Sequence, residues 1–514
     1  MLIKTYGSAV YGVEAITITV EVNVDNQGKF YYIVGLPDNA VKESMQRVES
    51  AIKSNHLYMP RTKLVVNLAP ADIKKTGTAF DLPIAIGVLA ATEQIDNPEK
   101  LSEYVIMGEL SLDGEVCPIK GALPIAIQAR KEGFKGLIVP KQNAREAAMV
   151  NNLNVYAVGH IREVIDFFTN ENTIEPTIVN TREVFAHAQS DFEIDFCDVK
   201  GQENIKRALE IAAAGGHNAI LIGPPGAGKT MLAKRLPTIL PPLSLQEALE
   251  TTKIHSVAGK LPENSTLISK RPFRSPHHTI SDVALVGGGG NPQPGEISLA
   301  HNGVLFLDEL PEFKRAVLEV MRQPMEERKV TISRAKVALD FPASFMLIAS
   351  MNPCPCGFFN HPEKDCTCPP GAVQKYLNKI SGPLLDRIDL HVEVTPVAFS
   401  ELSSSQQFEK SIHIRERVIK AREIQAIRYA GNEGVYANAQ MSSKQLKEIC
   451  VITAAGQHLL KIAMEKLNLS ARAYDRILKV SRTIADLASS DDIKPEHLAE
   501  AIQYRSLDRE GWGA

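Results

Sequence analysis

The residues with the clearest chemical capacity begin at Gly223, in the segment Gly-Pro-Pro-Gly-Ala-Gly-Lys-Thr. This spacing matches the G-x-x-x-x-G-K-[ST] pattern, in which backbone N–H groups wrap nucleotide phosphates at a helix N-terminus. Lys229 would neutralise the β- and γ-phosphates, and the Thr230 hydroxyl would hold Mg²⁺. The sequence therefore predicts that ATP and Mg²⁺ bind at Gly223, Pro224, Pro225, Gly226, Ala227, Gly228, Lys229 and Thr230.

A pair of carboxylates follows the apolar run at residues 303–307. Asp308 would coordinate Mg²⁺ directly or through water, and Glu309 would orient and polarise the attacking water. An acidic pair after a buried strand can also simply cap the next helix. The phosphate-binding segment in the same chain favours the catalytic interpretation.

Three further polar side chains follow in an order typical of AAA+ ATPases. Asn352 ends an apolar strand, where its amide would hydrogen-bond the γ-phosphate or the nucleophilic water; this is the sensor 1 position. Arg387 follows an apolar turn and would reach the γ-phosphate of a neighbouring subunit in a ring. Arg472 begins a helix and would act as sensor 2 in the same subunit. A single arginine is more often a surface ion pair, so the order and context carry these assignments.

Four of the seven cysteines lie within one short polar segment. Four thiolates are the ligand set of a closed structural zinc site, although the spacing is C-x-C rather than the commoner C-x₂-C. Exposed free thiols, the alternative, would be an oxidation liability in a loop. The sequence predicts a structural Zn²⁺ held by Cys354, Cys356, Cys366 and Cys368.

A candidate DNA-binding hairpin precedes the strand that ends at Asn352. Apolar and polar residues alternate on both sides of a turn near residues 333–336. Arg334 and Lys336 would lie at or near the tip, and Arg328 and Lys329 at the base. Such tips are often only solvated, but in related motors a hairpin directly before the sensor strand lines the pore and grips DNA phosphates.

A second insertion lies between the phosphate-binding segment and Asp308. It contains a run of glycines at residues 287–290 and resembles the helix-2 insert of chelatase and replicative-helicase relatives. His277 and His278 precede it, and we assign them no chemistry because paired loop histidines are more often structural.

The helices and strands predicted around these residues indicate an α/β multidomain protein. The length of 514 residues fits about three domains. An α/β domain is expected at residues 1–168, a polar linker at 169–192, an AAA+ core with the cysteine segment at 193–396, and a helical lid at 397–514.

The first domain resembles the proteolytic domain of Lon proteases at residues 75–83 and 107–119. Lon chemistry needs a serine activated by a lysine. Thr78 or its neighbours stand in place of the serine, and Leu123 or Pro124 where the lysine should be. The resemblance therefore implies a non-catalytic domain that assembles the protein or guides its substrate.

Segments at residues 273–281, 294–310 and 384–390 resemble the magnesium-chelatase-like AAA+ proteins. With the Lon-like first domain and the helical tail, the similarity is to the YifB/ComM family and covers essentially the whole chain. That family includes a hexameric helicase that drives branch migration during uptake and integration of transforming DNA. The resemblance implies a homo-hexamer, formed with nucleotide, that acts on single-stranded or branched DNA; the residues alone indicate an ATPase motor.

Overall composition limits the partners. With 57 basic and 60 acidic residues the net charge is −3, which argues against a globally cationic nucleic-acid coat but allows a local basic patch. No apolar run reaches membrane-spanning length, and the first residues lack a secretory signal. We expect a cytoplasmic protein with no membrane partner.

Two other functions were weighed against a DNA motor. One is a chelatase subunit that powers metal insertion into a tetrapyrrole, against which the Lon-like first domain and the cysteine segment count. The other is an ATP-dependent Lon-like protease, against which the missing serine–lysine pair counts.

Overall fold

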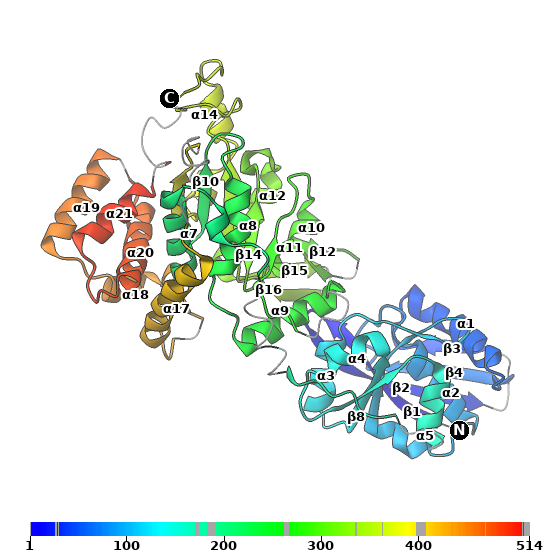
Figure 1. Ribbon diagram of the computed structural model, residues 1–514. Coiled ribbons are helices and arrows are strands. Elements are labelled where there is room, and N and C mark those ends of the chain that lie inside the picture. Colours follow the sequence, from blue (N-terminus) through cyan, green and yellow to red (C-terminus); the bar gives the residue numbers. More distant parts are fainter. Residues whose placement is uncertain are drawn as a thin grey trace.

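The computed structural model describes most of the chain and shows three bodies in chain order (Figure 1). An α/β domain contacts a central α/β module, and a helical lid covers another side of that module. The described residues are 2–25, 28, 30–169, 174–181, 185, 192–261, 267–290, 292–334, 337–361, 363–396, 408–432, 434–467, 469–505 and 507. Within them, every helix is too short or too polar to span a lipid bilayer.

The first domain is built on a seven-stranded sheet of order β3-β4-β2-β1-β5-β8-β9. Its strands are β1 (Leu2–Tyr11), β2 (Glu14–Asp25), β3 (Tyr31–Val34), β4 (Lys63–Ala69), β5 (Tyr104–Ile106), β8 (Gly136–Pro140) and β9 (Asn154–Val158), with a small hairpin of β6 (Glu109–Leu110) and β7 (Val116–Cys117). The helices are α1 (Asn39–Ser54), α2 (Asp81–Ala91), α3 (Ala122–Lys131), α4 (Lys141–Ala147) and α5 (Ile161–Thr169). Every residue of α2 is buried, as expected of a helix that is apolar on all sides.

The central module contains a five-stranded parallel sheet of order β11-β14-β17-β10-β18. Its strands are β10 (Ala219–Ile222), β11 (Phe273–Arg274), β14 (Val304–Leu307), β17 (Met346–Met351) and β18 (Leu390–Glu393). β10, β14 and β17 are buried at every position, which is typical of parallel strands covered on both faces. Because they are parallel, the residues that follow these three strands meet at one edge of the sheet.

Helices and two small hairpins complete the module. The helices are α7 (Glu203–Gly215), α8 (Lys229–Ile239), α9 (Leu245–Ala258), α10 (Asp282–Val286), α11 (Glu296–Leu299), α12 (Arg315–Glu319), α13 (Arg322–Glu327), α14 (Ala372–Leu377) and α15 (Gly382–Leu385). The glycine run enters a two-residue pairing of β12 (Gly287–Gly288) with β13 (Gln293–Pro294). The predicted hairpin before the sensor strand is confirmed: β15 (Lys329–Arg334) pairs with β16 (Val337–Pro342), from Lys329 opposite Pro342 to Arg334 opposite Val337.

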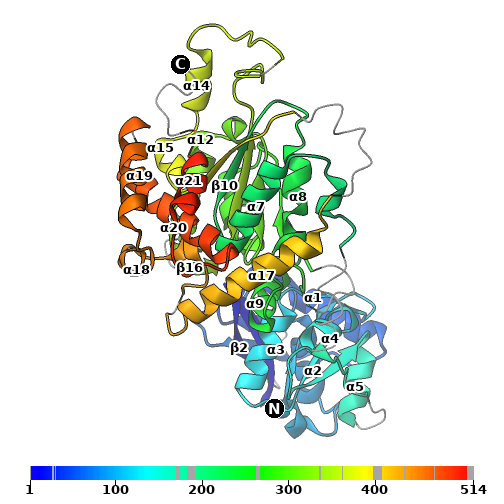
Figure 2. The same ribbon diagram turned by 60° about the vertical axis from the view of Figure 1, so that its left-hand side comes forward.

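The lid is wholly helical in its described part. It comprises α17 (Ser411–Arg428), α18 (Ser443–Ile449), α19 (Ala454–Lys466), α20 (Ala471–Leu487) and α21 (Pro495–Gln503). Figure 2 shows α17 running obliquely across the module, where it packs on α7 and α8.

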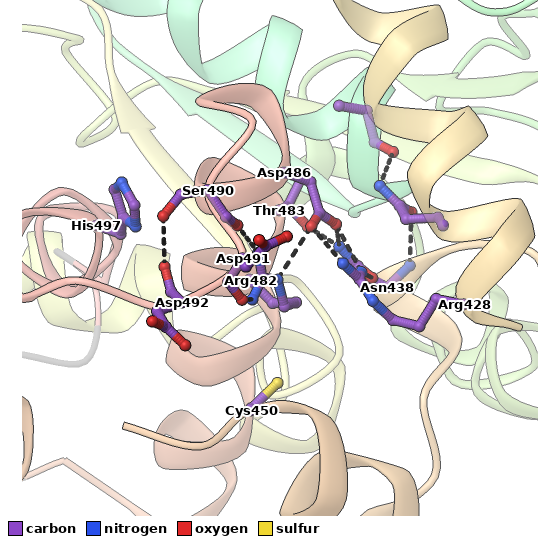
Figure 3. A network of polar contacts seen from close by, with 12 residues as sticks. Arg428, Asn438, Cys450, Arg482, Thr483, Asp486, Ser490, Asp491, Asp492 and His497 are labelled. Carbon is purple, nitrogen blue, oxygen red and sulfur yellow. Dashed lines mark hydrogen bonds and ion pairs between the residues drawn. The ribbon is translucent and has the colours of Figure 1, made fainter. Parts of the chain in front are cut away.

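A buried polar network ties the lid together (Figure 3). His217 extends this network to the module. Arg428 Nη2 and Arg482 Nε lie 2.6 Å and 3.0 Å from Asp486 Oδ1. Thr483 Oγ1 lies 2.8 Å from Nε2 of His217, whose Nδ1 lies 3.0 Å from Asp389 Oδ2 just before β18. Because buried charges are costly without partners, this network fixes how α20 packs on α7 and on the residues that precede β10 and β18.

The first domain contacts the module through α3 and α9. Ser256 of α9 donates its hydroxyl to Glu146 and accepts the Gly121 N–H at 3.1 Å. Burial raises the pKa of Glu146. The turn between β1 and β2 also reaches the module, since a Cβ at Gly12 would lie 3.6 Å from Leu339 of β16. The first domain thus contacts the middle of the β15–β16 hairpin, where Leu339 pairs with Ile332.

Candidate active site

The phosphate-binding segment forms the turn between β10 and α8. Gly226 and Gly228 have φ values of +77° and +83°, in the left-handed region that favours glycine. Lys229 Nζ donates to the carbonyls of Gly223 at 2.6 Å and Pro224 at 2.9 Å, and to Asn352 Oδ1 at 3.1 Å. Burial lowers the pKa of Lys229, and the carboxylates of Asp308 and Glu309 oppose that shift. The ammonium is thereby held inside the turn, beside the sensor amide.

The carboxylate of Asp308 is oriented by hydroxyls from two sides. Thr230 Oγ1 donates to Asp308 Oδ2 at 2.7 Å, and Ser350 Oγ donates to Asp308 Oδ1. Asp308 and Thr230 are therefore adjacent, as shared Mg²⁺ binding requires. Ser350 was not expected from the sequence. It is fully buried in β17, and its only signal is that it is a polar residue in an apolar strand.

The backbone of Glu309 lies in the left-handed region, with φ of +55°. Non-glycine residues adopt this conformation rarely, and such positions concentrate at functional sites. Its side chain is 57% exposed, and its Oε2 lies 3.5 Å from His278 Nδ1. His278, which the sequence left without a role, thus faces Glu309, whereas His277 Nδ1 lies 2.9 Å from Thr279 Oγ1.

A pocket of about 440 Å³ opens beside Glu309 and Asn352. Its other lining residues are Glu312, Pro355, Ala372, Lys375, Tyr376 and Lys379. Lys379 Nζ lies 3.1 Å from Glu312 Oε1, and burial raises the pKa of the Tyr376 hydroxyl. The pocket lining therefore carries two lysines and two glutamates beside Asn352.

The two arginines predicted to contact nucleotide lie in ion pairs outside the phosphate-binding segment. Arg387 pairs with Glu326 of α13. Arg472 Nη1 lies 2.6 Å from Asp386 Oδ2, the residue that precedes Arg387. Both assignments remain predictions, and nucleotide contact by either side chain requires exchange of its ion pair.

The four clustered cysteines have the geometry of a metal site. Their sulfurs all lie within 4.8 Å of one another. Cys354 Sγ is 3.3 Å from Cys356 Sγ and 3.7 Å from Cys366 Sγ, and Cys356 Sγ is 3.5 Å from Cys366 Sγ. Four sulfurs around a tetrahedral Zn²⁺ at about 2.3 Å would lie about 3.8 Å apart. The residues present therefore fit zinc.

The candidate DNA-binding residues differ in how the structure places them. Lys336 lies outside the described residues, as does the side chain of Arg334. At the hairpin base, Lys329 Nζ lies 2.8 Å from Asp340 Oδ2, and Arg328 donates to the carbonyl of Gly434 in the lid. The base cations thus have protein partners.

Among the described residues, Thr78, which stands near the Lon serine position, has a carboxylate and no amine as its side-chain partner. Thr78 Oγ1 donates to the Glu109 carboxylate, and Leu123 is fully buried in α3. Lys75, also fully buried, donates to the Pro70 carbonyl, and burial lowers its pKa. Thr78 therefore has a carboxylate partner, although the sequence indicated a hydroxyl without a base, and the serine–lysine pair of Lon remains missing.

Comparisons with known proteins cover the whole chain. The family profile described as magnesium chelatase, subunit ChlI, matches residues 195–402. The profiles for subunit ChlI of Mg-chelatase and for the ChlI C-terminal region match residues 20–143 and 408–505. The match at 20–143 corrects one inference from the sequence, because the first domain does not separate this chain from chelatase subunits.

Relatives of full length are also found. Competence protein ComM of Haemophilus influenzae is 44% identical over 506 residues, which are 98% of this chain and 97% of that protein. The uncharacterized protein YifB of Escherichia coli is 44% identical over 509 residues, 98% of this chain and 96% of that protein. Lon protease 2 of Bacillus subtilis is 33% identical over 154 residues, 27% of this chain and 26% of that protein.

Proposed function

This chain belongs to the YifB/ComM family of magnesium-chelatase-like AAA+ ATPases, and we therefore propose that it is an ATP-driven ring motor acting on DNA. The observation that carries the proposal is the convergence of Lys229, Thr230, Asp308 and Asn352 at one edge of the parallel sheet. Each would meet a different part of a bound ATP–Mg²⁺, so the arrangement supports hydrolysis as the source of work.

In the proposed cycle each residue has a distinct task. Lys229 leaves the carbonyls of its own turn to neutralise the phosphates. Thr230 and Asp308 would hold Mg²⁺, which would supply positive charge to the phosphates. Glu309 orients and polarises the attacking water, and Asn352 contacts that water or the γ-phosphate.

Ring assembly would complete the site. Arg387 is proposed to leave Glu326 and place its guanidinium on the γ-phosphate held by the neighbouring subunit, as charge develops there. Arg472 would contact nucleotide in its own subunit after exchanging its pair with Asp386. A site completed by a neighbour's arginine supports a nucleotide-dependent ring, and the family resemblance supports a ring of six identical subunits.

We propose single-stranded or branched DNA as the substrate, and branch migration of recombination intermediates in natural transformation as the process. Two observations support this. A full-length relative is named a competence protein. The hairpin β15–β16 lies directly before the sensor strand β17 and carries basic residues at its predicted tip. The cysteine cluster is proposed to hold a structural Zn²⁺.

A chelatase-type ATPase subunit is the second candidate, favoured by the three family profiles. The two are separated by ATP hydrolysis measured without addition, with branched DNA and with unfolded protein. A DNA motor is expected to be stimulated by branched DNA alone. Equal rates in the three conditions would contradict the DNA proposal, and stimulation by unfolded protein would favour an ATP-dependent protease.

A further inference from the structure

The cysteine loop, defined as residues 353–371, begins and ends at the pocket beside Glu309. It starts directly after Asn352, which lines that pocket, and its first ligand candidate, Cys354, follows two residues later. It ends at α14, whose Ala372, Lys375 and Tyr376 line the same pocket. Whatever fixes the loop therefore fixes two walls of the pocket.

The loop also contributes a wall of its own. Pro355 lines the pocket and lies between Cys354 and Cys356, so two candidate metal ligands flank it in the chain. Cys354 is fully buried, and its sulfur accepts the N–H groups of Gly357 at 3.2 Å and Phe359 at 3.3 Å. Such bonds around a ligating sulfur orient the neighbouring backbone.

Gly357 places the loop against the phosphate-binding segment itself. A Cβ at Gly357 would lie 2.6 Å from Cδ and 3.2 Å from Cγ of Pro225. Gly357 also has a φ of +86°, in the region that favours glycine. The residue whose N–H is held by the Cys354 sulfur is thus the residue that approaches the phosphate-binding turn.

We propose that the metal-bound cysteine loop supports the ATP site from its Asn352 and Pro225 sides, so that zinc occupancy sets ATP affinity and turnover. This inference rests on the proposed ATPase function. Since binding of a structural metal supplies folding free energy to the segment that holds it, metal loss would free the loop between Asn352 and α14. The metal-bound loop would then no longer hold Asn352 and Pro355 in place or keep Gly357 against Pro225.

The first test removes the two distal ligands, Cys366→Ser with Cys368→Ser, which touch neither the pocket lining nor Pro225 among the described contacts. The control is Cys117→Ser with Cys197→Ser, the same change at half-buried cysteines outside the loop. The distal variant is expected to lose zinc, to bind a fluorescent ATP analogue more weakly and to hydrolyse ATP about tenfold more slowly or worse. The control is expected to match wild type in all three.

Loss of zinc with wild-type ATP affinity and turnover would overturn the inference. If zinc-loaded wild type hydrolyses no ATP, the proposed ATPase function is contradicted instead. The affinities of the distal and control variants for the fluorescent ATP analogue would then still test whether zinc supports nucleotide binding. Metal analysis that finds no zinc in wild type purified without chelator would overturn it as well.

A second pair of variants leaves all four thiols in place. Gly357→Ala puts a methyl group against Pro225, whereas Gly371→Ala imposes similar backbone strain at φ of +77° with nothing within 4 Å of the new Cβ. We expect both to retain zinc, and only Gly357→Ala to weaken ATP binding and slow turnover several-fold. Equal ATP affinity and turnover in the two variants would overturn the proposed contact between loop and nucleotide.

Discussion

At the scale of single residues, the site contains two kinds of side chain. Some are proposed to contact ATP or Mg²⁺, and others orient those side chains. Lys229 is held 3.1 Å from Asn352 Oδ1, and Thr230 lies 2.7 Å from Asp308. Ser350 contacts the other oxygen of Asp308 without a ligand role of its own. The two kinds of residue should therefore differ in how their loss affects binding and turnover.

Lys229→Ala is expected to abolish ATP binding, because it removes phosphate neutralisation, whereas Glu309→Gln should bind ATP and stop turnover. Equilibrium binding of labelled ATP and the steady-state rate of phosphate release separate the two. Rapid hydrolysis by Glu309→Gln would exclude Glu309 as the residue that orients water.

Ser350→Ala should lower kcat by about 10- to 100-fold and leave ATP binding near wild type, because Asp308 loses the hydroxyl that orients it. Ser298→Ala is the control, since Ser298 is also fully buried and its hydroxyl has no hydrogen-bond partner among the described residues. We would measure kcat for ATP hydrolysis and the Mg²⁺ concentration that gives half of the maximal rate. Equal kcat in the two variants would mean that Ser350 does not act through Asp308.

The ligand-contacting residues could be predicted because their spacing is fixed within one short segment or directly after a strand. Ser350 and His278 could not be, since their roles arise from neighbours in space. Ser350 meets Asp308 only because β14 and β17 are parallel neighbours. His278 meets Glu309 only through the path of the loop that follows β11.

At the scale of elements, the hairpin β15–β16 was predictable because alternation and turn lie within one short window. β1 was not, since it mixes apolar residues with Thr5 and Ser8. Both are buried because hydrogen bonds satisfy them: Thr5 Oγ1 donates to Pro83 O at 3.0 Å, and Ser8 Oγ to Ile16 O at 3.1 Å. Neither partner lies within β1 itself, and Pro83 is 78 residues from Thr5, so a local pattern does not show these bonds.

Replacing Arg334 and Lys336 with Ala should preserve ATP binding and ring assembly but reduce DNA-stimulated turnover. The salt dependence of DNA affinity should flatten by roughly one unit per lost phosphate contact. Lys329→Ala, at the base of the same hairpin and paired with Asp340, should have a smaller effect. If the double variant keeps the wild-type salt slope, the glycine-rich insert around Gly287 becomes the next candidate.

At the scale of the whole molecule, the three bodies meet at functional elements. The lid network ends at Asp389, close in sequence to Arg387. The first domain packs on α9 and contacts β16 in the middle of the hairpin. In an assembled ring, the nucleotide site would therefore be linked to the lid through Asp389 and Arg387, and the hairpin would be linked to the first domain through β16.

Arg387→Ala is expected to bind ATP and hydrolyse it poorly. Mixed with Lys229→Ala, it should partly recover hydrolysis, because some interfaces then combine an intact phosphate-binding segment with an intact arginine from the next subunit. The hydrolysis rate is measured across mixing ratios after subunit exchange. If the hydrolysis rate of each mixture is only the weighted average of the rates of the two variants, Arg387 does not act at the nucleotide site of a neighbouring subunit.

Electron microscopy of the protein with a non-hydrolysed ATP analogue and a forked DNA tests the ring motor most directly. We expect closed six-subunit rings with the DNA in the central pore, beside the tip of the β15–β16 hairpin, and Arg387 of each subunit at its neighbour's nucleotide. Monomers under saturating nucleotide and DNA, or rings with DNA bound only on the outer surface, would contradict it.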